Sequence, residues 1–389
     1  MRSWVLAAGL MLIAAAGRAE TVLGATYLKL REPPRPVLSN LDPIPEDEGI
    51  AGARLALADN MTTGSFLGQS YTLDVVDLQP GADALTAARD ALATAPFLIL
   101  DADAATVMAV ADLPEARDAL IFSVAAQDRI LRDEGCRANV FLTAVSYAMR
   151  ADALMQALLV KRWTRLALIS GPTPADRAFA EALKASATKF GLEIVAEKDW
   201  SERADLRRTA SAEVPLFTQD LPDHDVLLIA DEADDFARYL AYNTWLPRPV
   251  AGSEGMTPVG WAPVLEQWGA AQLQSRFEDQ SARQMRPRDY AAWAAMRTLG
   301  EAMTRTNSAD PATLRAFILS DEFELAGFKG RPLSYRRWNG QLRQPVPVVH
   351  PRALVAEAPV TGFLHQRNEL DTLGLDEGES ACTLFGDAK

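Results

Sequence analysis

Short apolar runs that do not alternate with polar residues most constrain what this chain can fold into. Phe97–Leu100 (FLIL), Arg165–Ile169 (RLALI) and Val226–Ala230 (VLLIA) are such runs, and a helical pattern follows each of them. A run of this kind indicates a strand covered on both faces, as in a parallel sheet between layers of helices. The alternation of strand and helix occurs in two successive groups. We therefore predict an α/β fold of two lobes, each a doubly wound parallel sheet.

The first 19 residues have the organisation of a signal peptide. Arg2 supplies a positive charge, residues 5–16 are apolar but too short to span a bilayer, and Gly17 and Ala19 are the small residues that signal peptidase reads. We expect cleavage after Ala19 and an exported mature protein. No later stretch is apolar over a length that crosses a membrane, so no membrane span is expected.

The charge, the cysteines and the histidines of the chain argue against several classes of function. The net charge of −13 and the pI near 4.9 argue against a nucleic-acid partner and favour a neutral or cationic ligand. In an oxidising compartment the two cysteines, Cys136 and Cys382, are expected to form a disulfide, which closes a long loop and contributes roughly 4–5 kcal/mol in the chain-entropy model. The chain has only three histidines and no C-x-x-C motif, so neither a zinc site nor a histidine-dependent hydrolase is expected.

Acidic side chains follow the predicted strands. Ligands of open α/β sheets bind at the carboxyl ends of the strands, so these residues are candidates for ligand binding. The set comprises Asp101, Asp103, Ser123, Asp128, Asp176, Asp231, Glu232 and Glu254. Each acid has a second interpretation as a helix N-cap, which we favour for any single residue, whereas the joint pattern favours a shared crevice. Glu46–Glu48 also precede a helical pattern, and there we favour helix stabilisation over a place at the crevice.

The order of elements after a signal peptide, with acids at the strand ends, resembles that of type I periplasmic binding proteins. These are the leucine/isoleucine/valine-binding class of ABC-transporter receptors, and the resemblance covers residues 21–347. Three segments resemble receptors associated with PQQ-dependent alcohol dehydrogenase systems: EVPLFTQD (Glu213–Asp220), LAGFKG (Leu325–Gly330) and GFLHQRNELDTLG (Gly362–Gly374). The resemblance implies a monomeric periplasmic component that binds a small molecule or ion, serves an inner-membrane ABC permease, requires no cofactor and is not an enzyme.

The resemblance also implies the domain boundaries. Lobe 1 is expected to hold residues 20–138 and about 256–325. Lobe 2 is expected to hold residues 139–255 and about 326–347, with a C-terminal extension at 348–389.

The ligand expectation follows from a departure from the family pattern. In amino-acid receptors, small hydroxyl residues after the FLIL-like strand bind the ligand carboxylate, whereas this chain has Asp101 and Asp103 there. Like charges at about 4 Å repel by several kcal/mol at a typical effective dielectric, so an ordinary α-amino acid is not expected. Only Glu254 matches the family, in which an acid there meets the ligand ammonium. A neutral or cationic organic ligand is therefore one hypothesis.

A hard cation is the other ligand hypothesis, because oxygen-rich and histidine-poor sites suit such ions. Many of the PQQ-dependent alcohol dehydrogenases that the family link implies use Ca²⁺ or a lanthanide. We therefore name Ca²⁺, a lanthanide or its chelate as possible cargo. The candidate metal ligands are Asp101, Asp103, Asp128, Asp231 and Glu254.

Two alternatives remain open at this stage. LILDADAAT resembles the D-x-D start of haloacid-dehalogenase-type phosphatases, which use two aspartates around Mg²⁺. Here the hydroxyl residue comes one position late, at Thr106, and no convincing lysine motif follows. The other alternative is a periplasmic sensory or scaffold protein that uses the same two-lobe fold.

Overall fold

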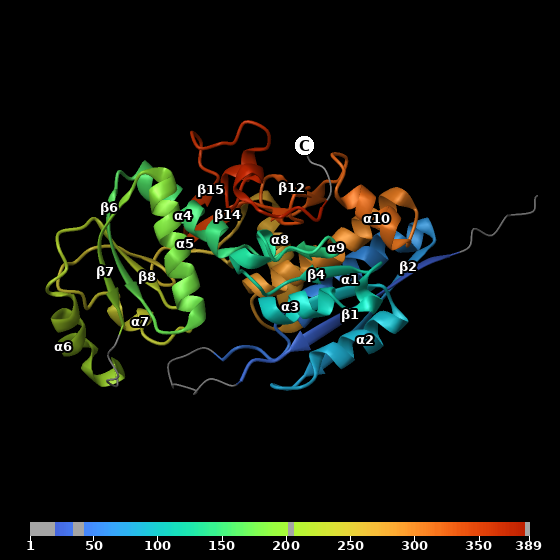
Figure 1. The fold of residues 1–389 in the computed structure, drawn as a ribbon, viewed down its shortest axis with the longest axis horizontal. Helices are drawn as coiled ribbons and strands as arrows, with labels where there is room; N and C mark the ends of the chain where they lie inside the picture. The colour runs from blue at the N-terminus through green and yellow to red at the C-terminus, as the bar shows by residue number, and fades with distance from the viewer. Residues whose placement is uncertain (1–19, 34–42, 201–205, 386–389) are drawn as a thin grey trace, which may run out of the picture.

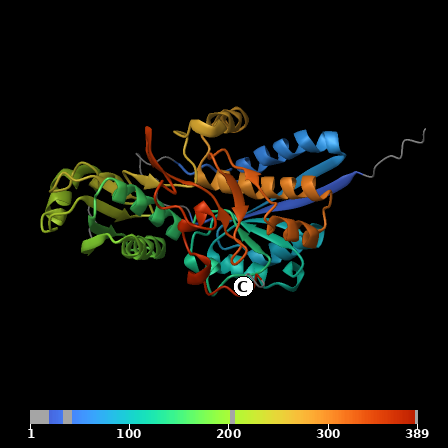
Figure 2. The same ribbon diagram turned by 90° about the horizontal axis from the view of Figure 1, so that it is seen from above.

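The computed structural model describes residues 20–33, 43–200 and 206–385. The predicted signal peptide lies outside the described residues. Two α/β lobes lie side by side, and the C-terminal segments run along the boundary between them (Figures 1 and 2). Within the described part of the chain, no helix combines the length and the apolar character needed to cross a membrane.

Lobe 1 is built on a five-stranded parallel sheet in the order β2-β1-β3-β4-β5. The strands are β1 (Thr21–Leu30), β2 (Gln69–Leu78), β3 (Phe97–Asp101), β4 (Leu120–Ser123) and β5 (Val140–Leu142). The helices of this lobe are α1 (Ile50–Leu67), α2 (Ala84–Thr94), α3 (Ala104–Ala111), α8 (Ala270–Ser281), α9 (Pro287–Thr306) and α10 (Pro311–Ile318). The last three belong to a return segment, in which α9 packs along α1.

Lobe 2 contains a four-stranded parallel sheet in the order β7-β6-β8-β9. The strands are β6 (Arg165–Ser170), β7 (Glu193–Asp199), β8 (Val226–Ala230) and β9 (Val250–Gly252). The helices are α4 (Tyr147–Val160), α5 (Pro174–Phe190), α6 (Leu206–Thr218) and α7 (Ala237–Leu240). Three short strands, β10 (Thr257–Pro258), β14 (Val346–His350) and β15 (Ala353–Ala358), form a separate antiparallel sheet.

The non-alternating runs are explained by cores on both faces of each sheet. In β3, Phe97 and Ile99 pack with α1 and α9, whereas Leu98 and Leu100 pack with α2 and α3. All five residues of β3 are buried. The strand β6 divides its side chains in the same way between two cores. The predicted fold class is therefore confirmed: helices cover both faces of these parallel sheets, and the apolar run Phe97–Leu100 contributes to a core on either face, while Asp101 ends the strand.

The first boundary of the lobes differs from the prediction. Residues 139–142 were expected to begin lobe 2, but Val140–Leu142 is β5, which pairs with β4 at the edge of the lobe 1 sheet. The crossover to lobe 2 follows at 143–146, and Val145 already packs in the lobe 2 core. A run of three apolar residues is too short to identify as a strand from periodicity.

The last boundary also lies later than predicted. Residues 326–343 were expected in lobe 2, but they form β11 (Leu325–Ala326), β12 (Pro332–Tyr335) and β13 (Leu342–Arg343), whose buried side chains join the lobe 1 core. The chain returns to lobe 2 only at Gln344–Pro345, because Val346 packs in the other core. Within the described residues the chain thus crosses between the lobes three times, at 143–146, 258–260 and 344–345.

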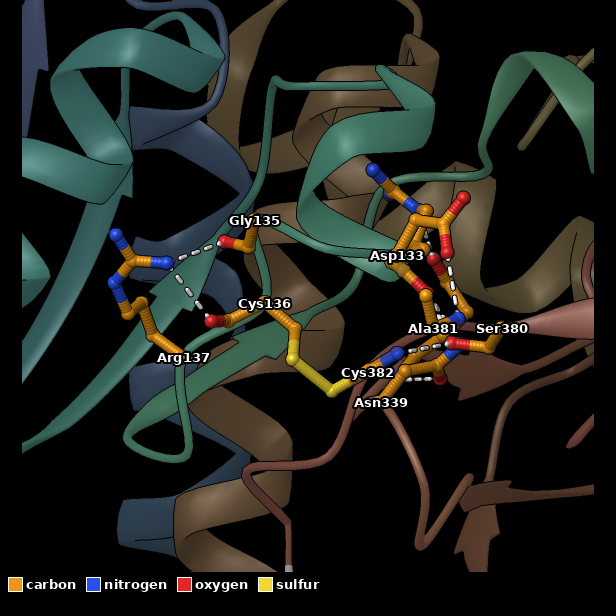
Figure 3. Close-up of a disulfide and its surroundings, with 10 residues drawn as sticks. Asp133, Gly135, Cys136, Arg137, Asn339, Ser380, Ala381 and Cys382 are labelled. Carbon is orange, nitrogen blue, oxygen red and sulfur yellow. Dashed lines mark hydrogen bonds between the residues drawn. A yellow bond between two sulfur atoms is a disulfide. The ribbon is translucent and has the colours of Figure 1, made fainter.

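The predicted C-terminal extension is part of the two-lobe body. The strands β14 and β15 pair with each other and pack on lobe 2, and the tail that follows contacts both lobes. The Arg336 guanidinium donates to Asp371 at 3.0 Å, and the Gly374 N–H donates to Asp152 at 2.7 Å. The Cys136–Cys382 disulfide fastens the end of this tail to lobe 1 (Figure 3), as predicted.

Removing the disulfide should lower the stability of the folded protein. Its two ends lie 246 residues apart, so the bond restricts a large part of the unfolded ensemble. We expect the Cys136→Ser/Cys382→Ser double variant to lose about 2–5 kcal/mol of unfolding free energy, measured by urea denaturation. Reductant should shift the wild-type midpoint towards that of the variant and leave the variant unchanged. Equal midpoints for the oxidised wild type and the variant would contradict this expectation.

Candidate functional site

A cavity of about 340 Å³ lies between the lobes, at the level of the crossovers. Both lobes and the connecting segments line it. From lobe 1 come Ile44, Glu48, Val124, Ala125, Gln127, Arg286, Pro287, Arg288, Tyr290 and Ala291; from lobe 2 come Arg150, Glu232 and Asp234; from the crossovers come residues 143–145 and 258–260 and Gln344. A cavity of this size suits a small ligand, and walls on two separate lobes allow it to close by lobe motion.

The lobe 1 wall presents two arginines from the start of α9. Pro287 occupies the first helical position, which lacks an intrahelical N–H bond in any case, and Arg286 and Arg288 flank it. Arg286 pairs with Glu48 at 2.7 Å, and Arg288 lies 3.4 Å from the buried carboxylate of Asp101. About a third of each guanidinium side chain stays exposed, 39% and 32% respectively, so both remain accessible from the cavity.

Asp101 is the buried acid that contacts Arg288 of this wall. It ends β3 with 2% of its surface exposed, accepts a hydrogen bond from the Tyr27 hydroxyl at 3.0 Å and faces Arg288. Burial raises the pKa of Asp101, and the Arg288 charge opposes that shift. In return, Asp101 holds the pKa of Arg288 above its ordinary value. Asp101 therefore fixes the position of an arginine in the wall instead of facing the ligand.

The lobe 2 wall is organised by Arg150, on the first turns of α4. Its two terminal nitrogens bind the carboxylate of Glu232 at 2.5 and 2.9 Å. The same side chain donates to Gln127 of lobe 1 at 3.0 Å and to the Pro258 carbonyl of a crossover at 3.0 Å. Ser253 donates to Glu232 at 2.9 Å. Arg150 thus joins lobe 2 to lobe 1 and to a connecting segment at the edge of the cavity.

Three of the seven strand-end acids accept hydrogen bonds from backbone N–H groups at the starts of helices and loops. Asp103 accepts from Thr106 N–H at the start of α3, and Asp176 accepts from the N–H groups of Glu232 and Ala233. Asp231 is 3% exposed and accepts from three N–H groups, those of residues 235–237. None of these three aspartates lines the cavity between the lobes, and the contacts favour the capping interpretation for each of them.

The remaining candidates lie apart from one another. Ser123 is fully buried, and its hydroxyl has no hydrogen-bond partner among the described residues. Asp128 stands at the start of a 3-10 helix, and Glu254 accepts the N–H of the next residue at 3.2 Å. Of the eight predicted site residues, Glu232 alone lines the cavity. Glu48, which we assigned to helix stabilisation, lines it as well.

No group of three or more acidic, histidine or cysteine side chains within the described part of the chain could hold a metal ion. The five proposed metal ligands are all described residues, so this set does not form a metal site. The phosphatase alternative fails for a related reason. Asp101 points at Tyr27 and Arg288 while Asp103 caps α3, so the two aspartates do not share a site.

A second, larger hollow of about 740 Å³ lies on lobe 1, against the C-terminal tail. Its charged groups are paired with each other: Arg343 with Asp371, Arg367 with Glu377 and Arg337 with Asp321. It does not lie between the two lobes, so lobe motion cannot close it around a ligand. The smaller cavity between the lobes is therefore the candidate functional site.

Sequence reasoning missed the arginines of the site. The sequence analysis considered acids that follow strands, whereas Arg286 and Arg288 lie at the start of a helix, about thirty residues after the second crossover. The sequence Arg-Pro-Arg before a long helical pattern was a usable signal, because proline at the first helical position places its neighbours at an exposed helix start.

The capping role of the aspartates can be tested by stability measurements. We expect Asp103→Ala to cost about 1 kcal/mol of unfolding free energy, like other N-cap losses. Asp231→Ala should cost more, about 3 kcal/mol, because it leaves several buried N–H groups without acceptors. Asp83→Ala, which removes an exposed N-cap from α2, is the matched control for Asp103→Ala. If Ca²⁺ or La³⁺ stabilised the wild type and Asp83→Ala but not Asp103→Ala, the capping interpretation would be wrong.

Comparison with known proteins supports the fold. A family model described as periplasmic binding protein matches residues 44–212. A branched-chain amino acid ABC transporter periplasmic ligand-binding protein from Burkholderia xenovorans has a TM-score of 0.70 at 14% identity, covering 94% of this chain and 100% of that one. No curated protein matches the sequence significantly.

Two further solved structures extend the comparison. A leucine-, isoleucine-, valine-, threonine- and alanine-binding protein from Brucella ovis, in a closed conformation, has a TM-score of 0.67 at 15% identity, covering 92% of this chain and 96% of that one. A solute-binding protein from R. palustris in complex with benzoate has a TM-score of 0.63 at 14% identity, covering 93% and 100%. The fold of this chain is therefore the type I periplasmic binding protein fold.

Proposed function

We propose that this protein is the substrate-binding component of an ABC transporter and closes its two lobes around a small organic carboxylate. The observation that carries the proposal is the cavity at the crossovers, which has arginines on both walls. Type I lobes move about such crossovers as hinges, so a ligand that contacts both walls favours the closed state by its differential affinity.

The choice of a carboxylate is supported by two arginines of the lobe 1 wall, although Glu48, Glu232 and Asp234 also line the cavity; Glu48 and Glu232 are paired with Arg286 and Arg150. Arg286 and Arg288 retain exposed surface on the lobe 1 wall, and guanidinium groups bind carboxylates with paired, charge-assisted hydrogen bonds. The long helix α9 adds positive potential at the same place through its N-terminal dipole. The expected repulsion of a ligand carboxylate does not arise, because Asp101 lies beneath Arg288 and Asp103 caps α3. The solved relative that holds benzoate has a ligand of the same class.

We also propose a periplasmic location, export by the N-terminal signal peptide, delivery to an inner-membrane permease and an association with PQQ-dependent alcohol oxidation. The support for the association is the resemblance of the three segments Glu213–Asp220, Leu325–Gly330 and Gly362–Gly374. The further oxidation of primary alcohols, through aldehydes, yields carboxylic acids, so a carboxylate receptor is chemically compatible with such a system. A Ca²⁺ or lanthanide cargo remains a competing proposal, and its ligands would have to differ from the five acids first named.

A thermal-shift screen of the mature protein tests the ligand class. The panel contains benzoate, acetate, leucine, ethanol, PQQ, Ca²⁺ and La³⁺. A ligand at a hundredfold excess over its Kd should stabilise the folded state by about 2.7 kcal/mol. We expect stabilisation by one or more of the organic carboxylates. Stabilisation by the metal ions alone would overturn the carboxylate proposal in favour of a cation.

The role of Arg288 can be tested with a charge-balanced variant. Arg288→Met alone would leave Asp101 buried without its partner, so the variant is Asp101→Asn/Arg288→Met. We expect its affinity for the bound carboxylate to fall at least tenfold, about 1.4 kcal/mol, in isothermal titration calorimetry. Arg305→Met is the matched control, because Arg305 lies at the far end of the same helix with 59% of its side chain exposed. Unchanged affinity in the double variant would remove Arg288 from the site.

A further inference from the structure

A buried lysine lies beneath the third crossover. Lys329, in the lobe 1 segment between β11 and β12, has only 2% of its surface exposed. Its amine donates to the Gln344 side-chain oxygen at 2.7 Å and to the Pro345 carbonyl at 3.3 Å. The Gln344 side-chain nitrogen in turn donates to the Thr143 carbonyl at 2.9 Å. The lysine therefore connects the third crossover to the first through one glutamine.

The same contacts reach the ligand cavity. Gln344, Thr143 and Tyr290 all line it, and the Lys329 amine lies 4.2 Å from the centre of the Tyr290 ring. The Tyr290 hydroxyl donates to the Gly327 carbonyl at 2.6 Å, which ties α9 to the segment that carries the lysine. Any change at the Lys329 amine thus acts on the cavity lining and on two crossovers.

The surroundings of Lys329 hold little opposing charge. The charge of Glu357, on β15, favours the protonated form of Lys329 and so raises its pKa. The charge of Arg331 in turn favours the ionised form of Glu357 and lowers the pKa of that carboxyl. The other neighbours are the Tyr290 phenol, whose ionisation burial suppresses, and neutral amide groups. Burial lowers the pKa of Lys329 to about 7, and the charge of Glu357 opposes that shift.

We propose that Lys329 is a positioning residue of the cavity: its amine fastens the third crossover to lobe 1, and protonation of that amine loosens the crossover and frees the lobes to move. The importance of Lys329 for ligand capture rests on the proposed function, whereas its contact with the third crossover does not. The direction follows from linkage. A loosened crossover exposes the amine to water and raises its proton affinity, so lower pH favours the loosened state.

Hydrogen–deuterium exchange of the ligand-free protein between pH 6 and pH 8 tests the proposal. After correction for the intrinsic exchange rates, protection of peptides covering residues 340–350 should fall several-fold towards pH 6 in the wild type, with a midpoint near 7. Peptides from β3 and β6 report on global unfolding and should keep their protection. The radius of gyration, measured by small-angle X-ray scattering, should change over the same pH range.

Three variants separate Lys329 from other causes. Lys329→Met keeps the aliphatic stem and should show a flat pH profile in both measurements. Glu357→Gln removes the opposing charge and should move the midpoint to lower pH, which also tests the proposal if the methionine variant does not fold. Lys184→Met, on the surface of α5, should behave as wild type. A flat wild-type profile, or a Lys329→Met profile equal to that of wild type, would overturn the proposal. Neither result depends on whether any carboxylate binds.

Discussion

Buried polar side chains that satisfy the crossover backbone are the contacts on which the rest of the structure depends. Where the chain leaves a sheet, its carbonyls lose their strand partners, and a buried carbonyl without a donor costs free energy. Gln341 donates to the carbonyls of Leu142 and Ala144, and Arg132 donates to those of Ala126 and Ala144. Arg132 also donates to the Gln341 side-chain oxygen at 2.6 Å, so the two residues form one network.

This network holds the crossovers without joining the lobes into one core. The apolar clusters of lobe 1 and lobe 2 are separate. Burial lowers the pKa of Arg132 to about 9, so it stays charged at neutral pH, and carbonyl oxygens surround that charge. The tail adds to the network, because the Ser380 hydroxyl donates to the Arg132 carbonyl. Ser380 lies two residues before Cys382 of the disulfide (Figure 3).

The acids at the strand ends contact other groups of the protein, whereas the sequence suggested that they face the cavity. Five or more acids follow strands in this chain, yet their commonest role is to accept backbone N–H groups at the starts of helices and loops. Asp101 is the instructive case, since it stands where a ligand contact was expected and instead anchors Arg288. A carboxylate behind an arginine lowers the cost of burying part of that cation and holds it in place.

The sequence by itself determined the two parallel-sheet lobes and the disulfide. The middle residues of strands such as β3 and β6 lie between two helical layers and are apolar on both faces, so a short apolar run without alternation is enough to predict them. The pairing of the two cysteines followed from their number and from the predicted signal peptide, without any geometry. Tertiary structure alone decided where the lobes divide and which charges face the cavity. The β5 and β11–β13 segments are too short for periodicity to place. Whether Asp231 caps a loop or faces a ligand depends on N–H groups several residues away. The positions of Arg150, Arg288 and Lys329 depend on contacts with residues more than eighty positions distant or across the crossovers. A local sequence pattern does not contain this information.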